Sequence, residues 1–331
     1  MKKRFFCGWR LAVLGIAALA VAFLSLLLGS EALSVGQVIG GIFRTDPQSV
    51  ASRILWAVRL PQTAACALAG AALAISGLLL QTATGNPLAG PNVIGVNAGA
   101  GIAMVLGLCF APMAYALLPL WCFLGAFGAA LLILFVANRV GASRVSLVLS
   151  GVAVSSLLSA GISGLRLLYP ELTVGYSAFS AGGVEGVTLS QLAVPAVIVA
   201  AVFMAALVLA PRLELLCLGD PLAASLGLRV RRIRVAALLL ASAAAGAAVS
   251  FAGLLGFVGL MVPHISRKLL GRGSVGKNLP ACALLGATLV MAADLLGRVA
   301  FAPSQLPAGI ITAVLGAPFF FILLLQRRNR L

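Results

Sequence analysis

The chain alternates long apolar runs with short charged segments. Ten windows that are free or nearly free of charge each predict a membrane helix, near 11–30, 58–82, 93–110, 114–137, 145–168, 190–210, 235–255, 258–270, 279–298 and 306–325. A helix needs about 20 apolar residues to cross a bilayer core. The pattern predicts an all-α polytopic membrane protein with about ten transmembrane helices, in one transmembrane domain over residues 1–331.

The eighth window, 258–270, is too short to cross a membrane alone. It follows the glycine-rich segment Gly253–Gly259, so we expect a bent or re-entrant piece there. Irregular backbone at membrane depth needs neighbouring protein to satisfy its hydrogen bonds, so this piece should lie against other helices.

The N-terminal segment shares features with a signal peptide, because Lys2, Lys3 and Arg4 precede a long apolar run. The uncharged run from Leu11 to Ser30 is longer than the apolar core of about 7–15 residues in such peptides. We therefore expect it to remain as the first transmembrane helix.

Composition excludes a soluble protein. The chain is 62% hydrophobic and 9% charged, whereas soluble domains carry about 25% charged residues. Residues 60–138 contain no Asp, Glu, Lys or Arg. The six cysteines include no close pair, so we expect neither a disulfide framework nor a metal site.

The net charge of +16 does not indicate nucleic-acid binding, because the basic residues are scattered among apolar runs. If the N-terminus lies inside, 18 of the 23 basic residues fall on the inner side, and the outer five are Arg44, Arg53, Arg59, Arg166 and Arg298. The positive-inside rule favours this orientation, with both termini cytoplasmic.

The segment 212–234 (RLELLCLGDPLAASLGLRVRRIR) is the longest water-compatible stretch between two apolar runs. It predicts a short capped helix, in which Asp220 accepts from backbone N–H groups and Pro221 occupies the first position. Gly227 would end this helix in the left-handed conformation. We expect a cytoplasmic surface where a partner applies force to the membrane helices.

A nucleotide site within this chain is not expected. Residues 271–278 (GRGSVGKN) match a phosphate-binding loop except at Asn278, which stands where a magnesium-binding hydroxyl is required. The run follows an apolar helix instead of a strand, so a basic turn explains it better. No nucleophile–base set is present, and catalytic residues are therefore not predicted.

Two further polar positions need an explanation. His264 is the only histidine, and its isolation favours a packing or hydrogen-bonding role over proton transfer. Asp294 and Arg298 lie four residues apart and can pair on one helix face. An ionisable residue inside a membrane is a functional candidate, and a structural ion pair is equally consistent with the spacing.

Several motifs resemble the FecCD-type permeases of bacterial ABC importers for iron-siderophore, haem and cobalamin. They run in order over nearly the whole chain and are specific when taken together. They are RLP (59–61), AGAALAISGLLLQ (69–81), GNPLAGPNVIGVNAGAG (85–101), LSGVAVS (149–155), LGDPLAASLGL (218–228), GFVGLMVPHISR (256–267), AD..GR (293–298) and LPAGIITAVLGAPFF (306–320).

The resemblance implies a type II ABC importer permease fold in the bacterial inner membrane. It implies a homodimer with the path at the subunit interface, two cytoplasmic ATPase subunits that bind ATP and magnesium, and a substrate-binding protein. No cofactor is expected on this chain itself. The ATPase-coupling residues would be Leu218, Gly219, Asp220, Pro221, Leu222, Ala223, Ala224, Leu226, Gly227 and Leu228.

The resemblance also places the path and the outer docking surface. Asn86 and Leu88 would lie at the cytoplasmic end of the path, and Ala142 and Ser143 would narrow it further. Arg59 and Arg298 would meet acidic residues of the binding protein. Some relatives have a second arginine where this chain has Gln62, so docking would use fewer charge pairs or draw on Arg53.

Two other classes of protein fit less well. An ion-coupled transporter usually places carboxylates in mid-membrane, and here only Asp294 is available, near one end. A membrane enzyme acting on lipid-linked substrates would need clusters of acidic residues or histidines, which the sequence lacks. Among substrates of the family, an iron-siderophore is favoured over haem and cobalamin because it is the broadest class.

Overall fold

The computed structural model describes residues 2–29, 33–43, 49–91, 95–111, 114, 117–140, 144–271 and 274–328, and within them it contains helices and no strands. In chain order these are α1 (Lys2–Leu27), α2 (Val35–Ile42), α3 (Val50–Ile54), the π-helical η1 (Leu55–Arg59), α4 (Leu60–Thr84), α5 (Val96–Phe110), α6 (Leu118–Arg139), α7 (Arg144–Leu168), α8 (Leu172–Ala181), α9 (Leu189–Leu216), α10 (Asp220–Ser225), α11 (Val230–Ala252), α12 (Val258–Leu270), α13 (Val275–Ala300) and α14 (Ala308–Arg328).

The predicted all-α membrane fold is confirmed. Each of the ten apolar windows coincides with a helix, namely α1, α4, α5, α6, α7, α9, α11, α12, α13 and α14. Within the described ranges, seven helices are long and apolar enough to cross a membrane, and α5 and α14 supply shorter apolar stretches. The π-helical η1 ends two residues before Pro61, which has no N–H to continue the helical hydrogen-bond ladder.

The expected break around the eighth window is also present. Helix α11 ends at Ala252, and α12 is only 13 residues long. Neighbouring segments satisfy the irregular backbone, since Leu254 N donates to Phe179 O at 3.0 Å and Gly183 N donates to Ala252 O at 3.0 Å. The α11–α12 connection is thereby hydrogen-bonded to α8 and to the turn after it, as membrane-depth backbone requires.

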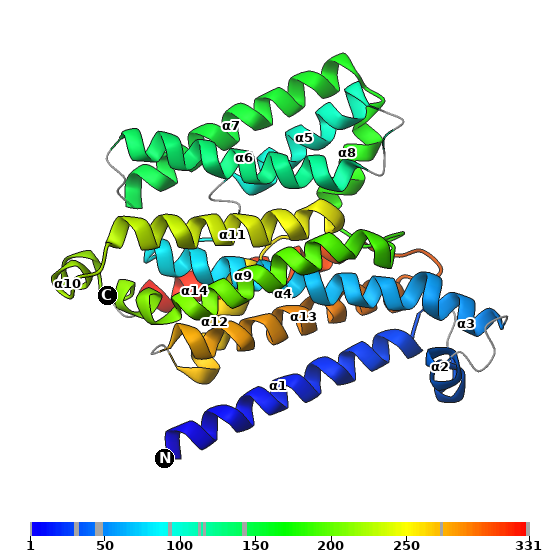
Figure 1. The fold of residues 1–331 in the computed structure, drawn as a ribbon. Helices are drawn as coiled ribbons and strands as arrows, with labels where there is room; N and C mark the ends of the chain where they lie inside the picture. The colour runs from blue at the N-terminus through cyan, green and yellow to red at the C-terminus, as the bar shows by residue number, and fades with distance from the viewer. Residues whose placement is uncertain are drawn as a thin grey trace.

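Helix α4 forms the centre of the molecule, with α9 and α11 on one side and α12 and α13 on the other (Figure 1). Glycines allow its closest contacts. A Cβ on Gly70 would lie 2.1 Å from Gly286 O of α13, and one on Gly77 would lie 1.7 Å from Gly259 O of α12. Small residues at these positions let the helix backbones approach each other closely.

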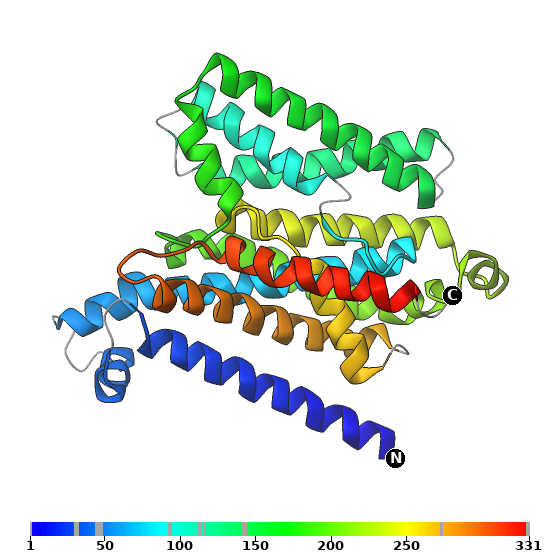
Figure 2. The ribbon, with the colours of Figure 1, turned by 180° about the vertical axis from the view of Figure 1, so that it is seen from behind.

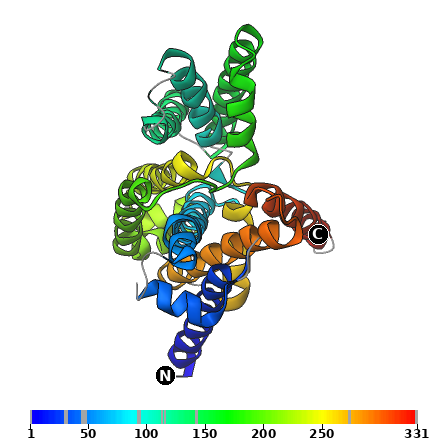
Figure 3. The same ribbon diagram turned by 90° about the vertical axis from the view of Figure 1, so that its right-hand side faces the viewer.

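The remaining helices surround this centre. Helices α5, α6 and α7 lie together on one side of α11, whereas α1 lies on the opposite side, against α13 (Figure 3). Helix α5 approaches α6 where a Cβ on Gly99 would lie 2.3 Å from Gly125 O. Helix α1 is largely uncovered by the rest of the chain, which leaves most of its surface to lipid or to another subunit.

The two ends of the helix bundle carry different elements. Both termini and α10 lie at one end, and α2, α3 and α8 lie at the other (Figures 1 and 2). The α10 end is also where α4, α6 and α9 finish and where α7, α11 and α13 begin. Of the 18 basic residues assigned to the inner side of the membrane, those that the structure describes belong to helix ends and turns at this end.

Candidate coupling and translocation site

Helix α10 is a single short helix with a well-formed C-terminal cap. Gly227 has φ +81°, and its N–H donates to Ala224 O at 2.9 Å. Leu228 N donates to Ala223 O at 3.0 Å, which completes a Schellman motif. The predicted left-handed stop at Gly227 is confirmed.

The predicted role of Asp220 as the N-cap is wrong. Gly219, with φ +100°, occupies the cap position without a side-chain hydrogen bond, and Pro221 follows as the second residue of the helix. The Asp220 carboxylate instead accepts from Nη2 of Arg234 at 2.7 Å on both oxygens. A buried guanidinium competes for the carboxylate more strongly than neutral backbone N–H groups do.

The outward face of α10 is apolar. Leu222 and the C-cap residue Leu226 are 50% and 56% exposed, and their spacing of four residues places them along one stripe. Leu218, just before the helix, is 54% exposed. Ala223 is fully buried against the bundle. A stripe of exposed leucines at the α10 end has the character of a docking surface for another protein.

The turn after α4 holds the predicted gate residues Asn86 and Leu88. Gly85 ends α4 with φ +63°, and the Asn86 Oδ1 accepts from Leu88 N at 3.0 Å. Asn86 is exposed and Leu88 half-buried, both at the α10 end of the bundle. Ala142 and Ser143 lie outside the described residues, between the end of α6 and the start of α7.

The stretch that matches a phosphate loop lies between α12 and α13 and includes the first residues of α13. The Asn278 Oδ1 accepts from Ser266 Oγ at 2.7 Å, and its Nδ2 donates to Ser274 O at 2.7 Å and to Gly271 O at 3.1 Å. Asn278 thereby joins α12 to α13 while buried in the protein. The described residues of this stretch form hydrogen bonds between α12 and α13, which agrees with the structural role that the sequence indicated.

His264 lies in α12 and meets the Phe319 ring edge-on, with 5.7 Å between ring centroids. Among the described residues, no group of three or more His, Cys, Asp or Glu side chains could hold a metal ion. A packing role for His264 therefore fits its surroundings.

At the opposite end of the bundle, the two arginines expected to dock a binding protein are buried. Arg59 is 3% exposed and Arg298 is 6% exposed. Arg59 Nη1 donates to Leu26 O at 2.6 Å and Leu27 O at 2.8 Å, and Arg298 reaches Ser25 O at 3.4 Å. Both therefore satisfy carbonyls at the C-terminal end of α1, where cations are favoured.

Arg298 also forms the ion pair suggested by its spacing from Asp294, with Nε 2.9 Å from Oδ2. Gln62 Nε2 donates to Asp294 Oδ1 at 2.9 Å, and Arg298 Nη2 donates to Ser25 Oγ at 2.6 Å. Ser25 Oγ lies 2.9 Å from Thr63 Oγ1. This cluster joins α1, α4 and α13 by polar contacts that the sequence alone did not reveal beyond the Asp294–Arg298 spacing.

Arg53 differs from these two arginines because its side chain is exposed, at the end of α3. Glu185 is also exposed at this end, in the segment between α8 and α9. Partial burial raises the pKa of Glu185, and the Asp294 carboxylate adds to this. This end of the bundle thus presents Arg53 and a carboxyl group, that of Glu185, which binds its proton more tightly than usual.

We expect Arg298→Ala to destabilise the protein. The substitution leaves Asp294, which is 1% exposed, buried without its cation. Removing one partner of a buried ion pair costs about 3–5 kcal/mol. The apparent melting temperature of the purified chain in lipid nanodiscs measures the loss.

The double variant Asp294→Asn with Arg298→Gln is the matched control. It removes both charges together, so it should lose less stability than Arg298→Ala alone. An Arg298→Ala protein that melts like the wild type would show that the Asp294–Arg298 ion pair does not stabilise the fold.

These features define a class of protein: an all-α membrane protein with several spanning helices and a short capped helix at one end of the bundle. The model of the FecCD transport family matches residues 17–326. The chain belongs to the FecCD transport family.

Individual relatives match over nearly the whole length. The achromobactin transport system permease protein CbrC of Dickeya dadantii is 40% identical over 324 residues, which cover 97% of this chain and 92% of CbrC. The ferric enterobactin transport system permease protein FepD of Escherichia coli is 37% identical over 325 residues, covering 97% and 96%. A solved "metal-chelate type ABC transporter" in "an inward-facing conformation" has a TM-score of 0.84 at 29% identity, covering 96% of this chain and 99% of that one.

Proposed function

We propose that this chain is the permease subunit of an ATP-driven importer that moves an iron-siderophore-type chelate from a binding protein into the cytoplasm. The observation that carries the proposal is the match along nearly the whole chain to permeases of iron-chelate transport systems. The exposed leucine stripe and capped α10 supply the surface that such a permease needs for its ATPase.

In this proposal the α10 end faces the cytoplasm. The excess of basic residues at that end follows the positive-inside rule, and both termini lie there as well. Two ATPase subunits, which carry ATP and magnesium, dock on residues 218–228 of two permease copies. The path runs between the two copies, with Asn86, Leu88, Ala142 and Ser143 at its cytoplasmic end.

The binding protein docks at the end that carries α2, α3 and α8. Arg53 is placed to meet an acidic residue of that protein, because it is exposed there. Docking through Arg59 and Arg298 stays a prediction, and it requires the end of α1 to move away from them. Charge pairs of this kind mainly set the rate and register of docking.

An ion-coupled transporter is the less suitable mechanism. Its coupling carboxylate would be Asp294, which is held by Arg298 and Gln62. A carboxylate that is paired with arginine at 2.9 Å cannot easily exchange a proton or a sodium ion during transport.

The proposal is tested by the ATPase activity of this chain co-purified with its cognate ATPase in lipid. The binding protein is added empty, or loaded with a ferric siderophore, haem or cobalamin. We expect the ferric siderophore form to stimulate hydrolysis more than the empty form. Stimulation by haem or cobalamin alone would correct the substrate, and failure to associate with any ATPase would refute the mechanism.

A further inference from the structure

We propose that Arg231 and Arg234, in the first turn of α11, are the positioning residues that transmit movement of α10 to α4 and α6. The inference rests on the proposed importer function and assigns a route within it. Both arginines lie near the start of α11, which follows α10 after a short connection. Arg231 bonds to α6, and Arg234 bonds to α4.

Arg234 connects α10 to the end of α4. Its Nη2 lies 2.7 Å from both Asp220 oxygens, and its Nε donates to Ala83 O at 3.0 Å. The Arg234 side chain is only 7% exposed, while that of Asp220 is 40% exposed. The guanidinium is planar and rigid, and it binds the Asp220 carboxylate and Ala83 O at the same time. A shift of Asp220 should therefore also shift Ala83.

The contact with Ala83 leads to the predicted gate. Ala83 lies in the last turn of α4, and the chain then passes through Gly85 to Asn86 and Leu88. This turn is itself held together, since Asn86 N lies 3.3 Å from Thr84 Oγ1 and Asn86 Oδ1 accepts from Leu88 N. A movement that reaches Ala83 therefore reaches the residues proposed to lie at the cytoplasmic end of the path.

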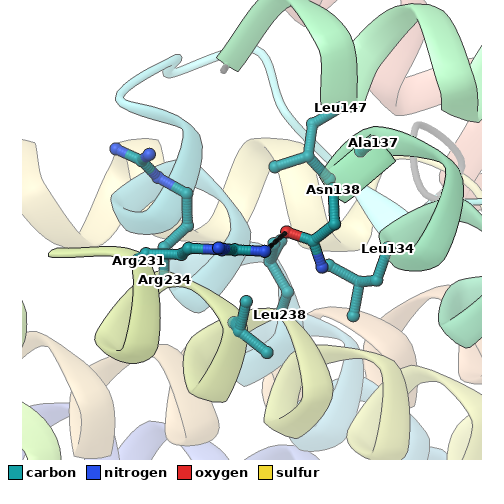
Figure 4. Close-up of a pocket in the computed structure, with 8 residues that line it drawn as sticks. Leu134, Ala137, Asn138, Leu147, Arg231, Arg234 and Leu238 are labelled. Carbon is teal, nitrogen blue, oxygen red and sulfur yellow. Dashed lines mark hydrogen bonds between the residues drawn. The ribbon is translucent and has the colours of Figure 1, made fainter. Parts of the chain in front are cut away.

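Arg231 connects α11 to the end of α6. Its Nη2 donates to Asn138 Oδ1 at 3.2 Å across a narrow pocket, which Figure 4 shows between the two helices. Arg234 also lines the pocket, and the other lining residues are apolar side chains of α6, α7 and α11, namely Leu134, Ala137, Leu147, Val235 and Leu238. Among the described residues that line the pocket, Arg231 and Asn138 form the hydrogen bond that crosses it.

The two arginines act together because they share one helix face. Positions three apart in a helix are neighbours, so Arg231 and Arg234 move with the first turn of α11 as a unit. The Schellman motif bonds Gly227 and Leu228 to α10, and only Arg229 separates these two residues from the start of α11. Arg232 lies on the same turn and is exposed, as Arg231 is, but its side chain makes no hydrogen bond or ion pair with α4 or α6 within the described residues.

The test measures the coupling ratio, which is the number of chelate molecules transported per ATP hydrolysed. The proteoliposomes contain this chain and its ATPase, and the loaded binding protein is added outside. We expect Arg231→Ala and Arg234→Lys each to lower this ratio about 5-fold or more. A factor of about 5 is the lower end of the range typical of coupling between distant sites. Lysine keeps the charge of Arg234 but cannot hold Asp220 and Ala83 O simultaneously. Arg232→Ala is the matched control and should keep the wild-type ratio.

A double variant separates transmission from folding. The double variant Arg231→Asn with Asn138→Arg exchanges the two partners. Its coupling ratio should be higher than that of either single variant. A wild-type ratio in Arg231→Ala and Arg234→Lys would overturn the inference while leaving the importer function intact. Absence of ATP-driven transport in the wild-type chain would instead refute the proposed function.

Discussion

Gly227→Pro is expected to uncouple ATP hydrolysis from transport while the membrane helices stay folded. Proline fixes φ near −65°, whereas Gly227 has φ +81°, and proline also removes the N–H that donates to Ala224 O. The conflict costs about 3 kcal/mol or more, which a helix of six residues cannot offset. Chelate uptake and ATP hydrolysis are measured together in proteoliposomes.

A graded variant serves as the control for this prediction. Gly227→Ala keeps the N–H and meets no atom within 4 Å, so it suffers only the left-handed penalty of about 1–2 kcal/mol. Its coupling should fall between those of the wild type and Gly227→Pro. Normal import by Gly227→Pro would show that α10 is not the element through which ATP hydrolysis acts.

Gly70→Ala and Gly77→Ala are expected to destabilise the bundle itself. Each added Cβ would overlap the backbone of a neighbouring helix, at 2.1 Å from Gly286 O and 1.7 Å from Gly259 O. Overpacking costs about 1–3 kcal/mol when side chains can adjust, and these backbone contacts leave little room to adjust. We expect a cost at or above the upper value, with greatly reduced yields of folded protein.

The matched control is Gly128→Ala in α6, where an added Cβ meets nothing within 4 Å. This variant should match the wild type or exceed it slightly, because alanine favours helix more than glycine. Melting temperature and monodispersity in detergent measure all three variants. Wild-type behaviour of Gly70→Ala and Gly77→Ala would mean that α4 does not pack this closely on α12 and α13.

The helices could be predicted from sequence because charge-free runs of sufficient length leave few alternatives in a membrane. Their ends were less predictable where helices continue beyond the apolar run. Helix α9 reaches Leu216, past the predicted end near 210, and α11 begins at Val230 instead of near 235. The helices continue through charged residues at these ends. The charge-free windows therefore predict only the apolar part of each helix and miss its charged end.

The contacts that position the site were largely beyond sequence reasoning. Asp220 was predicted as a cap because of its place before a proline, but the buried Arg234 takes its carboxylate. Gln62 and Asp294 are far apart in sequence and meet only because α4 packs on α13. Spacing in the chain predicts contacts within one helix and gives no information on such partners.

The importer function is tested most directly by ATP-driven accumulation of a ferric siderophore inside proteoliposomes. The vesicles contain this chain with its ATPase, ATP is enclosed, and the loaded binding protein is added outside. Proton and sodium gradients are abolished with ionophores. The proposed function predicts accumulation that needs ATP and the binding protein and survives the loss of both gradients. Accumulation that needs a gradient and ignores ATP would contradict it.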